Sequence, residues 1–114
     1  MITIKGINPK MIANNLTPFE LTHPGSLLKE EIEYRGISQK KLSVQTGISY
    51  TVLNEVLNCK RNISTEYAML FEAALGIDAR ILTRTQIDYD MQTAKRNKTF
   101  SERLANIRKQ AAML

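Results

Sequence analysis

The feature that most constrains the fold is a three-residue pattern that occurs four times between residues 36 and 78. It reads Gly36-Ile37-Ser38, Gly47-Ile48-Ser49, Asn62-Ile63-Ser64 and Gly76-Ile77-Asp78. Gly or Asn tolerates the left-handed backbone that ends a helix, and Ser or Asp accepts hydrogen bonds from the first amides of the next helix. Each isoleucine has an apolar residue five positions later, which is the spacing of a hydrophobic staple. The pattern predicts short helices joined by tight turns.

Size and composition narrow the class of protein. A chain of 114 residues fits one domain, and a hydrophobic content of 43% is typical of a globular protein. The single cysteine, Cys59, excludes an internal disulfide framework and fits a reducing compartment. The sequence shows neither an apolar run of membrane-spanning length nor a signal-peptide pattern at its start. We therefore expect a cytoplasmic protein.

The formal charge of +5 is unevenly placed along the chain. Residues 35–61 carry five positive and one negative charge, residues 62–93 two positive and five negative, and residues 95–109 six positive and one negative. Concentrated positive charge suits the neutralisation of DNA phosphates with release of counterions. The alternative is a solvated surface that only keeps a small protein in solution.

Helical spacing of apolar residues dominates from residue 24 onward. It predicts helices over 24–35, 39–46, 50–58, 65–75 and from 79 to the low nineties, with Pro24 in the first turn of the first one. A final amphipathic helix follows, with Ser101 or Thr99 as its cap. The only possible strand is a short piece at 2–4. The sequence predicts an all-α fold with an arm at 1–22, a DNA-binding domain at 23–94 and a basic amphipathic helix at 95–114.

The first two occurrences of the three-residue pattern lie eleven residues apart, which leaves room for one short helix and a tight turn before a second capped helix. In a basic protein this arrangement predicts a DNA-binding helix-turn-helix, whose second helix lies in the major groove. The expected base-reading residues are Ser49, Tyr50, Thr51 and Asn54. The expected phosphate contacts are Gln39, Lys40, Asn58, Lys60 and Arg61. The alternative is that these residues are ordinary polar groups on the wet side of a helical bundle.

The sequence offers little for catalysis. The only histidine, His23, precedes Pro24 and fits a helix start better than a general base. With one cysteine and one histidine the chain cannot assemble a Cys/His zinc site, and its five glycines are too scattered for a phosphate-binding loop. We expect no enzyme activity, no cofactor and no metal.

Several of these motifs resemble a known family. The run Ser38-Gln39-Lys40-Lys41-Leu42 with Gly47-Ile48-Ser49 resembles the helix-turn-helix of the Xre/Cro repressor superfamily. The opening from His23 to Glu31 resembles the His-Pro-Gly-Glu start of HigA-type antitoxins. Similar, too, are Asn54-Glu55-Val56-Leu57-Asn58 with Lys60-Arg61, and Gln86 with Tyr89-Asp90. The resemblance covers about residues 22–94.

The resemblance implies a five-helix, lambda-repressor-like domain and a dimeric repressor. It would bind a palindromic double-stranded DNA operator ahead of its own operon, in the nucleoid. Its partner would be a HigB-type ribosome-dependent mRNA endonuclease, the cognate toxin that it neutralises. The alternatives are a stand-alone or phage-type repressor without a toxin, and a helical adaptor that binds protein. A neighbouring gene for a small basic nuclease would distinguish an antitoxin from a stand-alone repressor. Measured DNA affinity would distinguish it from a protein-binding adaptor.

The chain departs from the family pattern in places. Cys59 stands where the family usually has glycine, which predicts a differently shaped helix end because cysteine gives up the easy left-handed conformation. Ile81-Leu82 replace an aromatic pair, and Asp88 stands where the family often has a basic residue. The arm and the basic tail also exceed the minimal pattern.

A dimeric repressor needs a partner surface away from the recognition helix. The expected interface is Ile81, Leu82, Gln86, Tyr89, Phe100, Leu104 and Ile107. An apolar stripe on the last helix has no place in a compact five-helix core, and such stripes usually mark partner surfaces. It could instead fold back on its own domain or bind the toxin.

Overall fold

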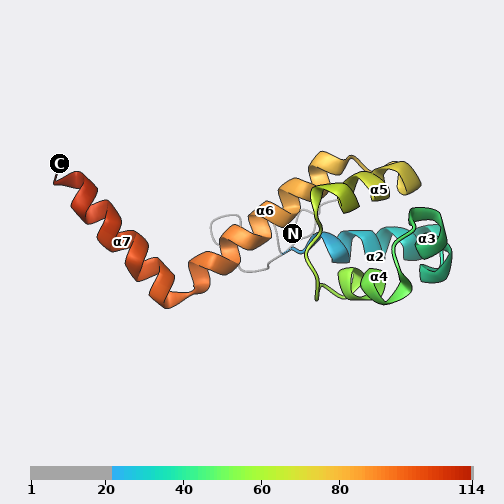
Figure 1. The fold of residues 1–114 in the computed structure, drawn as a ribbon, viewed down its shortest axis with the longest axis horizontal. Helices are drawn as coiled ribbons and strands as arrows, with labels where there is room; N and C mark the ends of the chain where they lie inside the picture. Colours follow the sequence, from blue (N-terminus) through green and yellow to red (C-terminus); the bar gives the residue numbers. More distant parts are fainter. Residues whose placement is uncertain (1–21, 114) are drawn as a thin grey trace, which may run out of the picture.

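The computed structural model describes residues 22–113. Within them the chain forms six helices and no strand: α2 Pro24–Arg35, α3 Gln39–Thr46, α4 Tyr50–Leu57, α5 Thr65–Leu75, α6 Ala79–Arg96 and α7 Lys98–Ala112. The all-α prediction is confirmed (Figure 1). The arm at 1–22 lies outside the described residues except for its last one, as does the possible strand at 2–4. None of the described helices has the length and apolar character needed to cross a membrane.

The helix boundaries follow the repeated signals. Ser38, Ser49 and Ser64 each accept a hydrogen bond from the backbone N–H three residues later, and Asp78 accepts one from the N–H of Arg80. Three of the predicted helix ends are left-handed glycines, with φ angles between +69° and +77°: Gly36, Gly47 and Gly76. These local expectations are confirmed.

The end of α4 differs from the prediction. α4 ends at Leu57, and the left-handed residue that follows is Cys59, with φ +62°, not Asn62. Two backbone hydrogen bonds hold this turn: Cys59 N–H donates to Val56 (3.0 Å) and Lys60 N–H donates to Glu55 (2.8 Å). A cysteine in this conformation costs about 1–2 kcal/mol, which these bonds offset. The expectation that Cys59 would change the shape of the helix end was therefore wrong.

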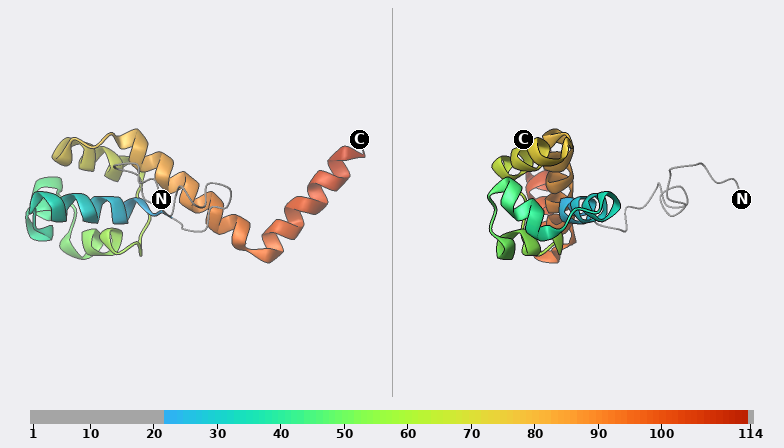
Figure 2. Two further views of the ribbon diagram at one scale, coloured as in Figure 1. Left: turned by 180° about the vertical axis from the view of Figure 1, so that it is seen from behind. Right: turned by 90° about the vertical axis from the view of Figure 1, so that its right-hand side faces the viewer.

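The core lies among α2, α3, α4, α5 and the first turns of α6, which cluster at one end of the molecule (Figure 2). Its fully buried side chains include Leu28, Leu42, Leu53 and Phe71. All four predicted staple pairs contribute: the isoleucines are buried or half-buried and their partners are buried. The repeated signals thus place helix ends and core contacts together.

The last two helices extend away from this core (Figure 1). The radius of gyration is 17.7 Å, against about 13 Å for a compact domain of roughly 100 residues. Asn97 alone separates α6 from α7, and its side chain caps α7 by accepting from Phe100 N–H (3.0 Å). The predicted caps Ser101 and Thr99 were wrong, since Ser101 Oγ instead donates to the carbonyl of Lys95 (2.6 Å). No residue of α7 is buried.

Candidate nucleic-acid interface

The turn between α3 and α4 is fixed by side chains of α3. Thr46 Oγ1 donates to the carbonyl of Leu42 (2.8 Å) and accepts from Ile48 N–H (3.2 Å). Ser43 Oγ donates to the carbonyl of Ile48 (2.5 Å). Because both hydroxyls bind across the turn, α4 leaves it at a defined angle. A recognition helix needs such a fixed angle to present its first turn to a groove.

The outer face of α4 is polar and its inner face is apolar. Leu53 and Val56 are fully buried in the core. Tyr50 is 53% exposed and Thr51 is also exposed. Ser49 Oγ accepts from Val52 N–H (3.3 Å) as the helix cap, and its O–H group can still donate to another partner.

Three amide side chains form a chain of hydrogen bonds across the predicted DNA face. Asn54 Nδ2 donates to Gln39 Oε1 (3.0 Å), and Asn58 Nδ2 donates to Asn54 Oδ1 (3.2 Å). The sequence placed all three on one surface without indicating that they touch. This chain orients the Asn54 amide and leaves Gln39 Nε2 without a partner among the described side chains.

A fourth residue joins this chain. Lys29 of α2 donates from Nζ to Asn58 Oδ1 at 3.4 Å. The sequence gives no indication of this contact, because no local signal connects residues 29 positions apart. Lys29 adds a positive charge beside the end of α4.

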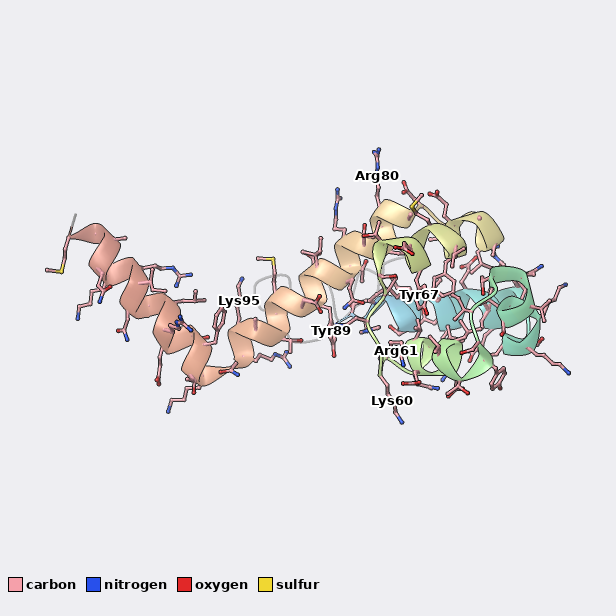
Figure 3. The ribbon with its side chains drawn as sticks, viewed as in Figure 1. Lys60, Arg61, Tyr67, Arg80, Tyr89 and Lys95 are labelled. Carbon is pink, nitrogen blue, oxygen red and sulfur yellow. The ribbon has the colours of Figure 1, made fainter. Side chains whose placement is uncertain are left out.

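The basic residues of the predicted interface lie at its margins. Lys40, Lys60 and Arg61 are all exposed. Lys60 extends from the loop after α4 away from the body of the domain (Figure 3). Arg61 lies 3.4 Å from Glu55, but exposed ion pairs contribute only about 0–1 kcal/mol. Its guanidinium can therefore exchange this carboxylate for a phosphate at little cost.

The loop that carries Lys60 and Arg61 is anchored to α6 by Gln86. Gln86 Oε1 accepts from the buried N–H of Ile63 (2.8 Å). Its Nε2 donates to Asn62 Oδ1 (3.1 Å) and to Asp90 Oδ1 (2.9 Å). The position of the basic loop thus depends on a helix outside the helix-turn-helix.

His23 has a structural role, as the sequence predicted. It is the N-cap of α2, and its Nδ1 accepts from Gly25 N–H (2.9 Å). Its ring packs edge-on against Tyr89 with centroids 4.8 Å apart. Burial lowers the pKa of His23, with Asp90 acting in the opposite direction. At Gly25 a Cβ atom would overlap the carbonyl oxygen of Val56, so the His-Pro-Gly opening seats α2 closely against α4.

Burial divides the residues that the sequence assigned to a dimer interface. Leu82 is fully buried and Gln86 is 5% exposed, so neither can offer a surface to a partner. The prediction is corrected for these two, which hold α6 to the domain. Ile81, Phe100 and Ile107 are between 42% and 55% exposed. Tyr89 and Leu104 are half-buried.

Comparison with known sequences gives two matches. A family described as helix-turn-helix matches residues 28–82. Virulence-associated protein I of Dichelobacter nodosus is 30% identical over 77 residues, which cover 67% of this chain and 71% of that protein.

Comparison with solved structures finds the same fold in antitoxins and antidote proteins. An addiction module antidote protein of the HigA family from Coxiella burnetii has a TM-score of 0.68 at 22% identity and covers 77% of this chain and 95% of its own. Pseudomonas aeruginosa antitoxin HigA, solved with the higBA promoter, has a TM-score of 0.63 at 25% identity, with 67% and 84% covered.

Proposed function

The chain belongs to the Xre-type helix-turn-helix family, whose members are DNA-binding proteins and not enzymes, and we propose that it is a HigA-type antitoxin. In this proposal it binds the operator of its own operon as a homodimer, represses transcription and neutralises a HigB-type mRNA endonuclease. The similar structure from Pseudomonas aeruginosa is that of an antitoxin solved with a promoter, which supports both the DNA-binding role and the antitoxin role in this proposal.

The observation that carries DNA recognition is the hydrogen-bonded chain that links Gln39 of α3 to Asn54 of α4 and to Asn58 at the end of α4. A side-chain amide can pair with adenine through two hydrogen bonds, and Asn54 is held ready by its two neighbours. Ser49, Tyr50 and Thr51 precede it and complete the base-reading set. Gln39 then acts as a positioning residue whose Nε2 remains able to donate to a phosphate.

Phosphate contacts surround this reading face. Lys40 is exposed in the first turn of α3, and Asn58, Lys60 and Arg61 are exposed in the segment that follows α4. Such contacts fix the position of the protein on the duplex without reading its sequence. Lys29, which already contacts Asn58, joins these groups.

One recognition helix reads only a few base pairs, so the functional unit needs two of them. In a two-fold dimer they lie about one DNA turn apart, roughly 34–36 Å. Exposed or half-buried side chains of α6 and α7 would form the partner surface away from α4: Ile81, Phe100, Leu104 and Ile107, with Tyr89 at its edge.

DNA binding is tested with a labelled duplex from immediately upstream of the first reading frame of the protein's operon and a scrambled duplex of equal length. Fluorescence anisotropy should show tighter binding to the first at moderate salt, and both affinities should fall steeply as salt rises. Equal affinity for the two duplexes would contradict a sequence-specific repressor.

The antitoxin role is tested by expressing the neighbouring reading frame with and without this chain. Co-expression should relieve growth arrest caused by the neighbour and yield a complex on co-purification. An Asn54→Ala variant should still relieve the arrest while repressing poorly, because its defect lies on the DNA face. If the neighbouring reading frame is harmless when it is expressed alone, the antitoxin role is refuted and the chain is a repressor without a toxin.

A further inference from the structure

An acidic groove follows the outer face of α2. It measures about 640 Å³ and is lined by Leu27, Glu30, Glu31, Tyr34 and Ile77. Leu27, the two glutamates and Tyr34 are spaced at three, four and seven residues, so they share one helix face. Tyr34 is 89% exposed. The groove thus combines one exposed aromatic side chain with two partly buried apolar side chains and two carboxylates.

The groove has a net negative charge, because only one of its two glutamates has a cationic partner among the described residues. Glu31 pairs with Arg35 at 2.7 Å, and the same guanidinium donates to the carbonyl of Leu75 (2.7 Å). Glu30 makes no ion pair within the described part of the chain. The groove also lies away from the side of α2 where Lys29 meets Asn58. A partner bound in it would leave the proposed DNA face free.

Helix α7 has the complementary character. Phe100, Leu104 and Ile107 recur at intervals of four and three residues and form one apolar stripe. Arg103 and Arg108 flank this stripe on opposite sides at helical spacing, and neither makes an ion pair with another described residue. No residue of α7 is buried, and within the stripe Phe100 and Ile107 are exposed while Leu104 is half-buried.

The groove and α7 of one chain lie far apart in this structure. α6 leads away from the domain, and with only Asn97 between the two helices, α7 continues away from α2 (Figures 1 and 2). Docking within one chain would require α6 to break. A second copy of the chain can supply the helix without any such change.

We propose that α7 of one copy docks in the α2 groove of a second copy. Its apolar stripe covers Leu27 and Tyr34, and Arg103 and Arg108 face Glu30 and Glu31. Two-fold symmetry makes the exchange reciprocal, so both grooves and both helices are covered in one dimer. This inference rests on the proposed homodimer and assigns its contacts. Complementary charge fixes the partner and the register.

The test uses sedimentation velocity of the full chain at micromolar concentration. Glu30→Lys/Glu31→Lys and Arg103→Glu/Arg108→Glu should each weaken self-association at least tenfold, because each places like charges across the interface. The variant with all four substitutions should regain association to within about threefold of the unmodified chain. Glu33→Lys/Glu66→Lys is the matched control, with the same charge change at exposed positions outside the groove, and should associate normally.

Circular dichroism of each variant excludes misfolding as the cause of a loss. A groove variant that dimerises normally, or a fourfold variant that stays monomeric, would overturn the inference while the homodimer stands. If only the Arg103→Glu/Arg108→Glu variant loses self-association, α7 packs on another surface, such as a second α7. That result would also overturn the inference. A monomeric unmodified chain would refute the homodimer as well.

Discussion

Replacing Gln86 with alanine should destabilise the domain although Gln86 lies outside the helix-turn-helix. Its amide makes three hydrogen bonds, two to the loop at Asn62 and Ile63 and one to Asp90 on its own helix, and its side chain is 5% exposed. The most costly loss is the acceptor for the buried N–H of Ile63. An unsatisfied buried donor costs about 1–3 kcal/mol.

Smaller contributions also change the free energy of unfolding of this variant. A lost buried methylene costs about 0.8 kcal/mol, while alanine avoids the side-chain entropy, up to about 2 kcal/mol, that glutamine loses on folding. The bonds to Asn62 and Asp90 are only partly buried, so water replaces them cheaply. We expect the free energy of unfolding to fall by about 2 kcal/mol, which is a large part of the 5–15 kcal/mol typical of a domain.

Urea unfolding followed by circular dichroism measures this change. Gln45→Ala is the control, because Gln45 is exposed on α3, and it should stay within about 0.5 kcal/mol of the unmodified protein. Gln86→Glu keeps the acceptor for Ile63 but places a second carboxylate beside Asp90, so its defect should grow as the pH rises above about 4.3. A Gln86→Ala loss below 0.5 kcal/mol would refute the reasoning.

Thr51→Ala and Asn54→Ala should each cost about 1–3 kcal/mol of specific operator binding with little change in unfolding free energy; normal binding by anisotropy would contradict the assigned reading face. Lys60→Ala/Arg61→Ala should lower the salt slope of binding by about one per lost phosphate contact, and an unchanged slope would make both ordinary surface residues. The lowered pKa of His23 means that the unfolded chain takes up a proton first, so stability should fall below about pH 6.5. His23→Asn keeps a capping acceptor and should flatten that pH dependence in urea titrations.

Helix ends were predictable because their signals are local. A serine cap and a left-handed glycine act on residues within one helical turn, and the pattern from Gly36 to Ser38 contains both. The end of α4 escaped prediction because Cys59 has no local preference for its conformation. There the hydrogen bonds to Val56 and Glu55 decide the backbone.

The set of polar residues on the proposed DNA face could also be predicted from the sequence, since the position of α4 after a tight turn fixes its outward side. The contacts among these residues could not be predicted from the sequence. Gln39 meets Asn54 across the turn, and Lys29 meets Asn58 from another helix. These pairs form only when α2, α3 and α4 are packed together.

The sequence by itself determined that this chain is helical, where most of its helices begin and end, and which helix presents polar side chains outward. The tertiary structure alone decided which face of α6 is buried. That helix has apolar residues all around: Leu82 packs in the core, while Ile81, Ile87 and Met91 are each more than half exposed. Periodicity cannot choose between two apolar faces, because the choice depends on which face meets α5 and α2 in space.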